Sequence, residues 1–207
     1  MIVQGHEITG PRSLRTHTLV VGSGSGGGVA AYRLAEAGVD TIVVEEGGHH
    51  VAAEFNQREE DMYPMLYRSG GQQMTSDGMI NVMQGSCYGG GTVINVSDAF
   101  DIPSEVLAHW QRTYGTSEWT EKSLEAPYRR VHRNVNVKRI NKSLVNRNNG
   151  LLLETAQKLG WSAEVMHSNR KGCVGSGYCL LGCAYDARLG TNLTYLPWAV
   201  EKGADVY

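Results

Sequence analysis

The sequence lacks the features that would tie the protein to a membrane or to nucleic acid. No apolar stretch among its 207 residues approaches the roughly 20 needed to span a bilayer. Residues 1–18 lack the apolar core of a signal peptide. The formal net charge of −2 gives no electrostatic reason to expect nucleic acid or an anionic membrane as a partner. We therefore expect a soluble, cytoplasmic protein without a membrane segment or a nucleic-acid partner.

One stretch departs from this balance of charge. Residues 126–153 contain seven Lys or Arg and no Asp or Glu. Such a run can mark a nucleic-acid surface when aromatic residues are interleaved with the basic ones. Here Tyr128 is the only Phe, Trp or Tyr in the stretch, and the rest of the chain offsets the charge. We therefore favour a solvated helix and loop over a nucleic-acid surface.

Cysteine is scarce, and three of the 4 cysteines lie in one glycine-rich stretch at Cys173, Cys179 and Cys183. Structural zinc needs four ligands, usually in C-x2-C pairs, so this C-x5-C-x3-C spacing disfavours zinc. The lack of an export signal argues against a disulfide. We expect buried free thiols, with an iron–sulfur cluster on three thiolates as the alternative. Cys87 stands alone and is expected to be a small packing residue.

Glycine, by contrast, is abundant: 26 of the 207 residues, about 13% against a typical ~7%, which suggests contact between backbone and ligand. Residues 22–27 read G-S-G-S-G-G, between the apolar run 19–21 and an alanine-rich stretch. This pattern predicts a short buried strand that reverses into a helix. Gly22 allows the tight turn, Gly24 lets the backbone approach a pyrophosphate, and Gly27 lets helix and strand pack closely. The diphosphate then lies at the positive end of the helix.

The residues after this loop complete a nucleotide-binding pattern. The helix is expected to end at Gly38, and a second apolar run, 41–44, leads into Glu45, 23 positions after the first loop glycine. An acidic residue about 20 positions after that glycine accepts hydrogen bonds from a ribose hydroxyl in dinucleotide-binding folds. We therefore interpret Glu45 as a ribose ligand and residues 16–48 as a dinucleotide-binding βαβ unit. Glu46 is expected to face the solvent.

A second glycine-rich loop spans residues 85–95 and follows residues 79–83, which we interpret as a strand. The loop marks a second place where the backbone comes close to a flat or charged group. A bulged hairpin is the alternative. Further along the chain, helices are expected at 104–114, 151–159 and 196–202.

The organisation of the chain is that of an α/β protein, because helices and strands alternate along it. Residues 104–160 are expected to form a helical insert, with a turn at 148–150 before its last helix. The adjacent His49 and His50 would point to opposite faces of a strand and have no third ligand nearby. Surface positions are therefore expected for them rather than a metal site.

Taken together, these motifs resemble those of the glucose-methanol-choline (GMC) flavin oxidoreductases. The first loop with E-x-G-G at 45–48 is similar to the family's opening motif, and residues 85–95 are similar to its second glycine motif. The pair His-Trp at 109–110, Gly115 and the run W-T-E-K-S-L at 119–124 follow in the family's order. The resemblance covers almost the whole chain. It implies a Rossmann-like FAD-binding fold of the glutathione-reductase type, incomplete and lacking most of the substrate-binding domain.

The resemblance implies FAD as the cofactor. The cofactor-binding residues that it implies are Gly22, Ser23, Gly24, Gly27, Glu45, Gly85, Gly89, Gly90 and Asn95. The first four match positions that hold the pyrophosphate, Glu45 matches the ligand of the adenosine ribose, and the loop within residues 79–100 matches the segment along the isoalloxazine. Ser86 stands where many relatives carry Arg or Lys. Some dehydrogenase members bind an iron–sulfur cluster at a cysteine trio like that of residues 170–190, which passes electrons to an acceptor protein.

The implied activity is FAD-dependent oxidation of the CH–OH group of an alcohol, sterol or sugar, with hydride transfer to flavin N5 and a base that takes the hydroxyl proton. The family keeps that base, a histidine, near its C-terminus. No match to it is found among the seven histidines, which are His6, His17, His49, His50, His109, His132 and His167. We expect no catalytic residue within this chain and an inactive N-terminal fragment. A non-catalytic flavin-binding fragment and, less favoured, an NAD-dependent dehydrogenase are the alternatives.

Overall fold

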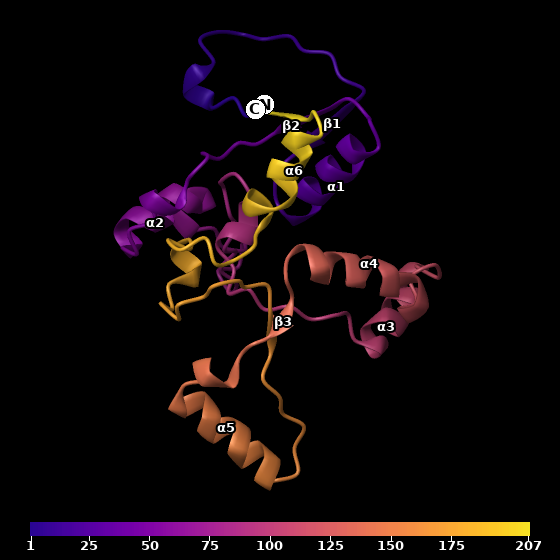
Figure 1. Ribbon diagram of the computed structural model, residues 1–207, viewed down its shortest axis with the longest axis vertical. Helices are drawn as coiled ribbons and strands as arrows, with labels where there is room; N and C mark the ends of the chain where they lie inside the picture. Colours follow the sequence, from indigo (N-terminus) through magenta and orange to yellow (C-terminus); the bar gives the residue numbers. More distant parts are fainter. The chain divides into compact units, whose positions relative to one another are not determined.

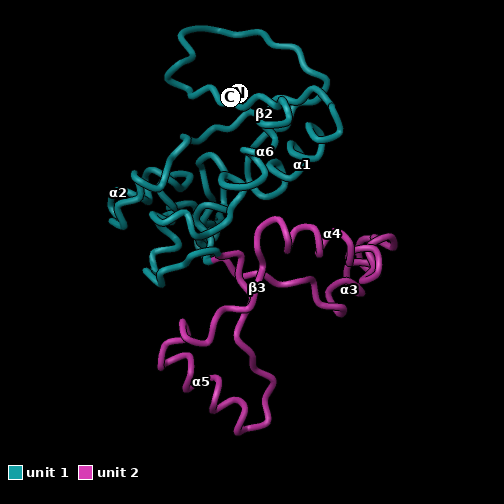
Figure 2. The backbone as a smooth tube through the Cα atoms, viewed as in Figure 1, with its two compact units in different colours: residues 1–96, 171–207 teal, residues 97–170 magenta.

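The computed structural model describes residues 1–207, and the chain divides into two compact units. Unit 1 comprises residues 1–96 and 171–207, and unit 2 comprises residues 97–170 (Figure 2, teal and magenta). The helical stretch expected at 104–160 lies within unit 2. None of the helices combines the length and the apolar character needed to cross a bilayer.

A three-stranded parallel sheet forms the centre of unit 1. Its strands are β1 (Thr18–Val21), β2 (Thr41–Val44) and β5 (Asp205–Val206), in the order β1-β2-β5. The central strand β2 is buried over its first three residues, whereas β1 lies at the edge and alternates between half-buried and exposed positions. Leu19 and Val21 of β1 are 56% and 78% exposed. The strand expected at 19–21 is therefore present but half-buried, because only one of its faces is covered.

Helix α1 (Ser25–Glu36) connects β1 to β2 and lies beside helix α6 (Tyr195–Glu201) (Figure 1). It ends as expected before Gly38, whose φ of +75° is the left-handed conformation that commonly follows a helix. Ala31 and Ala35 face α6 and belong to one hydrophobic core with α6 and the sheet. The expected α/β pattern of strand, helix and strand is thus confirmed in this part of the chain.

A second hydrophobic core lies beneath the second glycine loop. Helix α2 (Glu59–Leu66) contributes Met62 and Leu66, both fully buried, and the loop contributes Cys87 at 1% exposure. The burial of Cys87 agrees with its expected packing role. Short 3-10 helices complete the unit: η1 (Gly5–Glu7), η2 (Ala52–Glu54), η3 (Arg68–Gly71), η4 (Gly90–Val93), η6 (Cys179–Leu181) and η7 (Thr191–Leu193).

The strand expected at residues 79–83 is absent, and this prediction was wrong. A single isolated bridge pairs Asn81 with Met74, and Met79 and Ile80 are 81% and 61% exposed. Apolar character signals a strand only where a sheet pairs with the segment, and the three-stranded sheet of unit 1 includes none of these residues. The glycine loop that follows is likewise no bulged hairpin, because it turns into the 3-10 helix η4.

Unit 2 is mainly helical. Its elements are α3 (Ser104–Tyr114), α4 (Glu121–Asn134), β3 (Lys138–Arg139), η5 (Lys142–Leu144), α5 (Arg147–Lys158) and β4 (His167–Ser168), with β3 and β4 paired antiparallel. The helix expected at 104–114 has the predicted bounds. The turn expected at 148–150 was wrong, because the Asn146 side chain accepts a hydrogen bond from the N–H of Asn149 and starts α5 there.

Candidate cofactor site

Both glycine loops line one cleft of about 780 Å³ in unit 1. The first loop contributes Gly22 and Gly24 at the carboxyl end of β1, and the second contributes Gly85, Gly90 and Gly91. The two loops are some sixty residues apart in sequence, so the fold rather than local sequence brings them together. Ligand sites in open parallel sheets lie at the carboxyl ends of the strands, which is where this cleft opens.

The first loop has the backbone that its glycines predict. Gly22 has a φ of +89°, in the left-handed region that favours glycine. A Cβ at Gly27 would lie 1.8 Å from the carbonyl oxygen of Gly22, so only glycine lets the first turn of α1 approach the strand this closely. A Cβ at Gly24, in contrast, would meet no atom within 4 Å. The space at Gly24 leaves the amino end of α1 open to the cleft, where an anion is stabilised.

The two glycine loops also touch one another. Gly90 has a φ of +53°, and a Cβ on it would lie 3.0 Å from the Cα of Gly24. A Cβ at Gly85 would lie 2.6 Å from the carbonyl carbon of Gly90. Side chains at these positions would push the loops apart or fill the cleft between them.

Ser23 joins three parts of the site. It is fully buried, and its N–H and hydroxyl both donate to Oε2 of Glu45, at 2.8 and 2.5 Å. The same hydroxyl accepts a hydrogen bond from the N–H of Gly89 at 2.8 Å. Oε1 of Glu45 accepts from the N–H of Gly47 at 3.0 Å. Ser23 therefore holds the carboxylate at the end of β2 and fastens the second loop to the first.

Two residues of the C-terminal stretch hold the second loop, and neither was expected from the sequence. The N–H of Thr191 donates to the Thr92 hydroxyl of the second loop at 3.0 Å, and the Thr191 hydroxyl donates to the Ser23 carbonyl oxygen of the first loop at 3.0 Å. Arg188 is 5% exposed, and its Nη1 donates to the carbonyl oxygens of Asn95 and Cys179, both at 2.5 Å. Burial lowers the pKa of the Arg188 guanidinium. The fold alone reveals these roles, since no motif marks either residue.

Charged groups border the cleft beside these loops. Arg68 lines the cleft and donates to Oε2 of Glu46 at 2.6 Å, while the hydroxyl of Ser86 lies 3.3 Å from the other carboxylate oxygen. The hydrogen bond from Arg68 lowers the pKa of Glu46. Glu46 is exposed, as expected. Arg68 thus supplies a cation to the cleft lining, whereas Ser86 supplies none.

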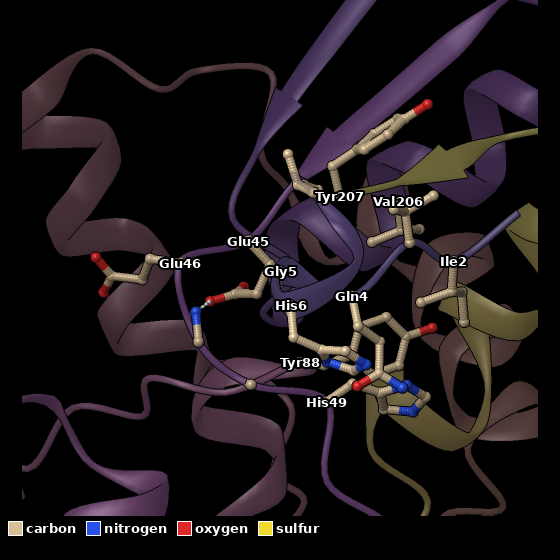
Figure 3. A pocket seen from close by; sticks show the side chains of 14 residues that line it. Ile2, Gln4, Gly5, His6, Glu45, Glu46, His49, Tyr88, Val206 and Tyr207 are labelled. Atoms are coloured by element: carbon tan, nitrogen blue, oxygen red, sulfur yellow. Dashed lines mark hydrogen bonds between the residues drawn. The ribbon is translucent and has the colours of Figure 1, made fainter. Parts of the chain in front are cut away.

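A second cavity, of about 370 Å³, adjoins the cleft, and Glu45 and Glu46 border both (Figure 3). Tyr88 and His49 line it, with ring centroids 4.4 Å apart. Burial and the neighbouring His50 lower the pKa of His49. Both histidines are half-buried, so the expectation of surface positions was wrong. The strand assumed there is absent, and the chain instead turns inward after Gly47, where a Cβ would lie 2.2 Å from the backbone of Ser86.

The cysteine-rich loop forms no metal centre. No group of three or more His, Cys, Asp or Glu side chains in the chain is placed to hold a metal ion. Cys173, Cys179 and Cys183 are free and half-buried rather than buried. The iron–sulfur interpretation therefore finds no support, and the carbonyl oxygen of Cys179 serves Arg188 instead.

Comparison with known proteins identifies relatives for most of the chain. A family model described as GMC oxidoreductase matches residues 63–207. An uncharacterized GMC-type oxidoreductase of Mycobacterium tuberculosis is 33% identical over 95% of this chain and 32% of its own length. The long-chain-alcohol oxidase FAO4B of Arabidopsis thaliana is 34% identical over 92% of this chain and 25% of its own length. The chain thus spans about a third or less of these relatives.

Solved structures share the fold. Pyridoxine 4-oxidase from Mesorbium loti matches 91% of this chain and 41% of its own, with a TM-score of 0.63 and 14% identity. Formate oxidase of Aspergillus oryzae matches 94% of this chain and 39% of its own, with a TM-score of 0.54 and 14% identity. The Rossmann-like fold expected from the sequence is confirmed by these likenesses.

Proposed function

This chain belongs to the GMC oxidoreductase family, and from that membership we propose that its cleft holds FAD for the oxidation of an alcohol CH–OH group. One observation carries the proposal: the amino end of α1, both glycine loops and Glu45 meet around a single cleft. Its volume of about 780 Å³ is within the range of small-molecule and cofactor sites.

The residues present fit the parts of FAD. The amino end of α1 at Gly24 suits the pyrophosphate, and Arg68 adds a positive charge at the same cleft. Glu45 suits the ribose, because Oε1 accepts a hydrogen bond from the N–H of Gly47 and keeps a lone pair for a hydroxyl. Ser23 contributes by holding the Glu45 carboxylate in place. Gly27 contributes because its lack of a side chain lets α1 approach the first loop closely. The second loop, with Gly85, Gly89, Gly90 and Asn95, is assigned to the isoalloxazine.

When bound, FAD supplies the two-electron oxidation. The chain contributes binding and orientation, and no histidine lines the cleft to accept the hydroxyl proton. Since general-base assistance typically contributes ~10²–10⁴-fold to the rate, we infer that these 207 residues alone do not oxidise alcohols. The match to a long-chain-alcohol oxidase supports an aliphatic alcohol over a sterol or sugar as the substrate. The acceptor protein and the cytoplasmic location stay predictions.

The first test is flavin binding. The purified protein mixed with FAD should show the visible flavin bands after gel filtration, and NAD should not compete. Glu45→Gln removes the charge that the ribose hydroxyl meets, so FAD affinity should fall by about 1–3 kcal/mol. Glu36→Gln, at the exposed far end of α1, is the matched control and should bind like the wild type.

The same preparation tests the chemistry. Anaerobic addition of a primary aliphatic alcohol should leave the flavin bands unbleached. Rapid bleaching would show that the chain holds its own base, and a protein without flavin bands would contradict the assignment of the cleft.

A further inference from the structure

A buried cation connects the cysteine-rich loop to the second glycine loop. Arg188 is 5% exposed, and its Nη1 donates to the carbonyl oxygens of Cys179 and Asn95, both at 2.5 Å. One nitrogen atom thus bridges η6 and the end of the second glycine loop. None of the ion pairs of the chain includes Arg188. Because a buried charge without a partner of opposite sign is costly, this guanidinium calls for an anion other than a carboxylate.

The acidic groups that act on this guanidinium are mainly thiols. Burial lowers the pKa of Arg188, and the first groups that oppose this shift are Cys179 and Cys183. A neighbouring arginine favours the thiolate, which is the reactive form of cysteine. Cys87 also lies near, but its side chain is buried at 1% exposure and out of reach of a reagent. Cys179 and Cys183 are free and half-buried, so they combine a neighbouring cation with access for a small molecule.

The chain turns between these two cysteines. Cys179 begins η6, and Cys183 follows Gly182, whose φ of +81° lies in the left-handed region. A Cβ on Gly182 would lie 2.8 Å from the Phe55 ring, so contact with the core requires glycine at this turn. The two thiols therefore flank one short turn and act on the same guanidinium. Oxidation of one thiol is commonly followed by attack of a neighbouring thiol on it.

We propose that Cys179 and Cys183 form an oxidation-sensitive pair that hydrogen peroxide converts into a disulfide, and that Arg188 passes this change to the second glycine loop. The thiolate of one cysteine attacks a peroxide oxygen, so that the O–O bond breaks, an S–OH group forms and the other oxygen leaves as water after taking up a proton. The sulfur of the second cysteine then displaces the S–OH oxygen, which leaves as water, and the S–S bond forms. The two thiols lose two electrons, and the peroxide is reduced to two molecules of water.

The disulfide acts on the second loop through Arg188. It is neutral, so it removes the anion that balances the guanidinium, and it constrains the backbone of η6. The Nη1 atom then holds the carbonyl oxygens of Cys179 and Asn95 less firmly, and the end of the second loop loosens. Disulfides in reducing compartments are usually transient and sense the redox state, as a reversible pair of this kind would. The reaction needs no cofactor and is independent of the proposed FAD function.

The first test counts thiols in the denatured protein after treatment with hydrogen peroxide. The wild type should fall from four free thiols to two, lose the mass of two hydrogen atoms and recover both thiols with dithiothreitol. Cys179→Ser and Cys183→Ser should form no disulfide within the chain. Cys173→Ser is the matched control, because it removes a half-buried thiol of the same loop that instead accepts a hydrogen bond from the N–H of Gly175. This variant should form the disulfide as the wild type does.

The second test concerns the cation. Arg188→Met removes the charge but keeps an unbranched side chain, and the reaction with peroxide should slow about 10-fold, because the thiolate loses its neighbouring cation. Arg188→Lys keeps the charge and should react at close to the wild-type rate. The rates are compared in variants whose circular dichroism matches that of the wild type.

Amide hydrogen exchange in the wild type tests the link to the second loop without any substitution. Exchange at residues 91–95 should rise several-fold in the oxidised protein and return after reduction, whereas exchange in β2 should stay the same. Four thiols after peroxide treatment, or a disulfide that contains Cys173, would overturn the pair. A disulfide between Cys179 and Cys183 with unchanged exchange at residues 91–95 would overturn the link through Arg188. An unchanged rate in a folded Arg188→Met variant would contradict the role of the cation.

Discussion

The two glycine loops that face each other across the cleft are held in different ways. The first is fixed by its neighbours in sequence, because β1 precedes it and α1 follows it. The second has no adjoining strand and is held by distant residues: Ser23 through the N–H of Gly89, and Arg188 through the carbonyl oxygen of Asn95. The conformation of the second loop therefore depends on the first. A substitution that distorts the first loop should disturb the second loop more than a substitution in the second loop disturbs the first.

The largest effect is expected at Gly27. A Cβ there would lie 1.8 Å from the Gly22 carbonyl oxygen, so Gly27→Ala should lower the free energy of unfolding by about 3 kcal/mol, as severe overpacking does. The cleft should then lose its affinity for FAD, because both loops that line it are displaced. Chemical denaturation measures the first effect and flavin fluorescence the second.

The neighbouring Gly26 is the matched control. A Cβ on it meets no atom within 4 Å, so Gly26→Ala should stabilise the helix by roughly 0.5–1 kcal/mol. Equal stability of the two alanine variants would contradict the close approach of α1 to the first loop.

Ser23→Ala tests the link between the loops. It removes the hydroxyl that donates to Glu45 and leaves the N–H of Gly89 without its partner, which should cost about 2 kcal/mol of unfolding free energy. Amide hydrogen exchange should rise at Gly89. Ser25→Ala, at the exposed start of α1, should change stability by less than about 0.5 kcal/mol. Unchanged exchange at Gly89 would show that the second loop stands independently.

The same contrast explains what the sequence could predict. The first loop, α1, β2 and Glu45 lie where the sequence indicates, because apolar runs and glycine spacing are local signals. The strand expected at 79–83 failed because its apolar residues signal a strand only when a sheet covers them. The GMC resemblance was confirmed by the family match. Yet the resemblance carries only motif positions, so it could not show that the Ser23 hydroxyl turns inward to Glu45.

The long-range partners lay beyond any local pattern. Thr191 stands 168 residues from Ser23 and Arg188 stands 93 residues from Asn95, and no sequence spacing connects them to the loops. Tyr88 lies within the second glycine motif, whose glycines indicate a role for the backbone and give no signal for a side chain. Buried hydrogen bonds between distant segments follow from the fold, so sequence patterns do not predict them.

Titration of Cys87 offers the mildest test of the second loop. Burial raises the pKa of this thiol to about 12 from an ordinary value of 9.0. The folded protein therefore keeps a proton that the unfolded chain releases above about pH 9. The contribution of the protonated Cys87 thiol to the free energy of unfolding is complete below pH 9 and is lost as the pH rises toward 12. Cys87→Ala has no such group. The difference in unfolding free energy between wild type and Cys87→Ala should be constant up to about pH 8 and narrow by roughly 1–2 kcal/mol at about pH 10.5.

Burial raises the pKa of Tyr67 to about 12 as well, but Tyr67 is present in both proteins and cancels from the difference. Urea denaturation at a series of pH values measures the gap, and a gap that stays constant through that range would show that water reaches the thiol and that the second loop is looser than its contacts indicate.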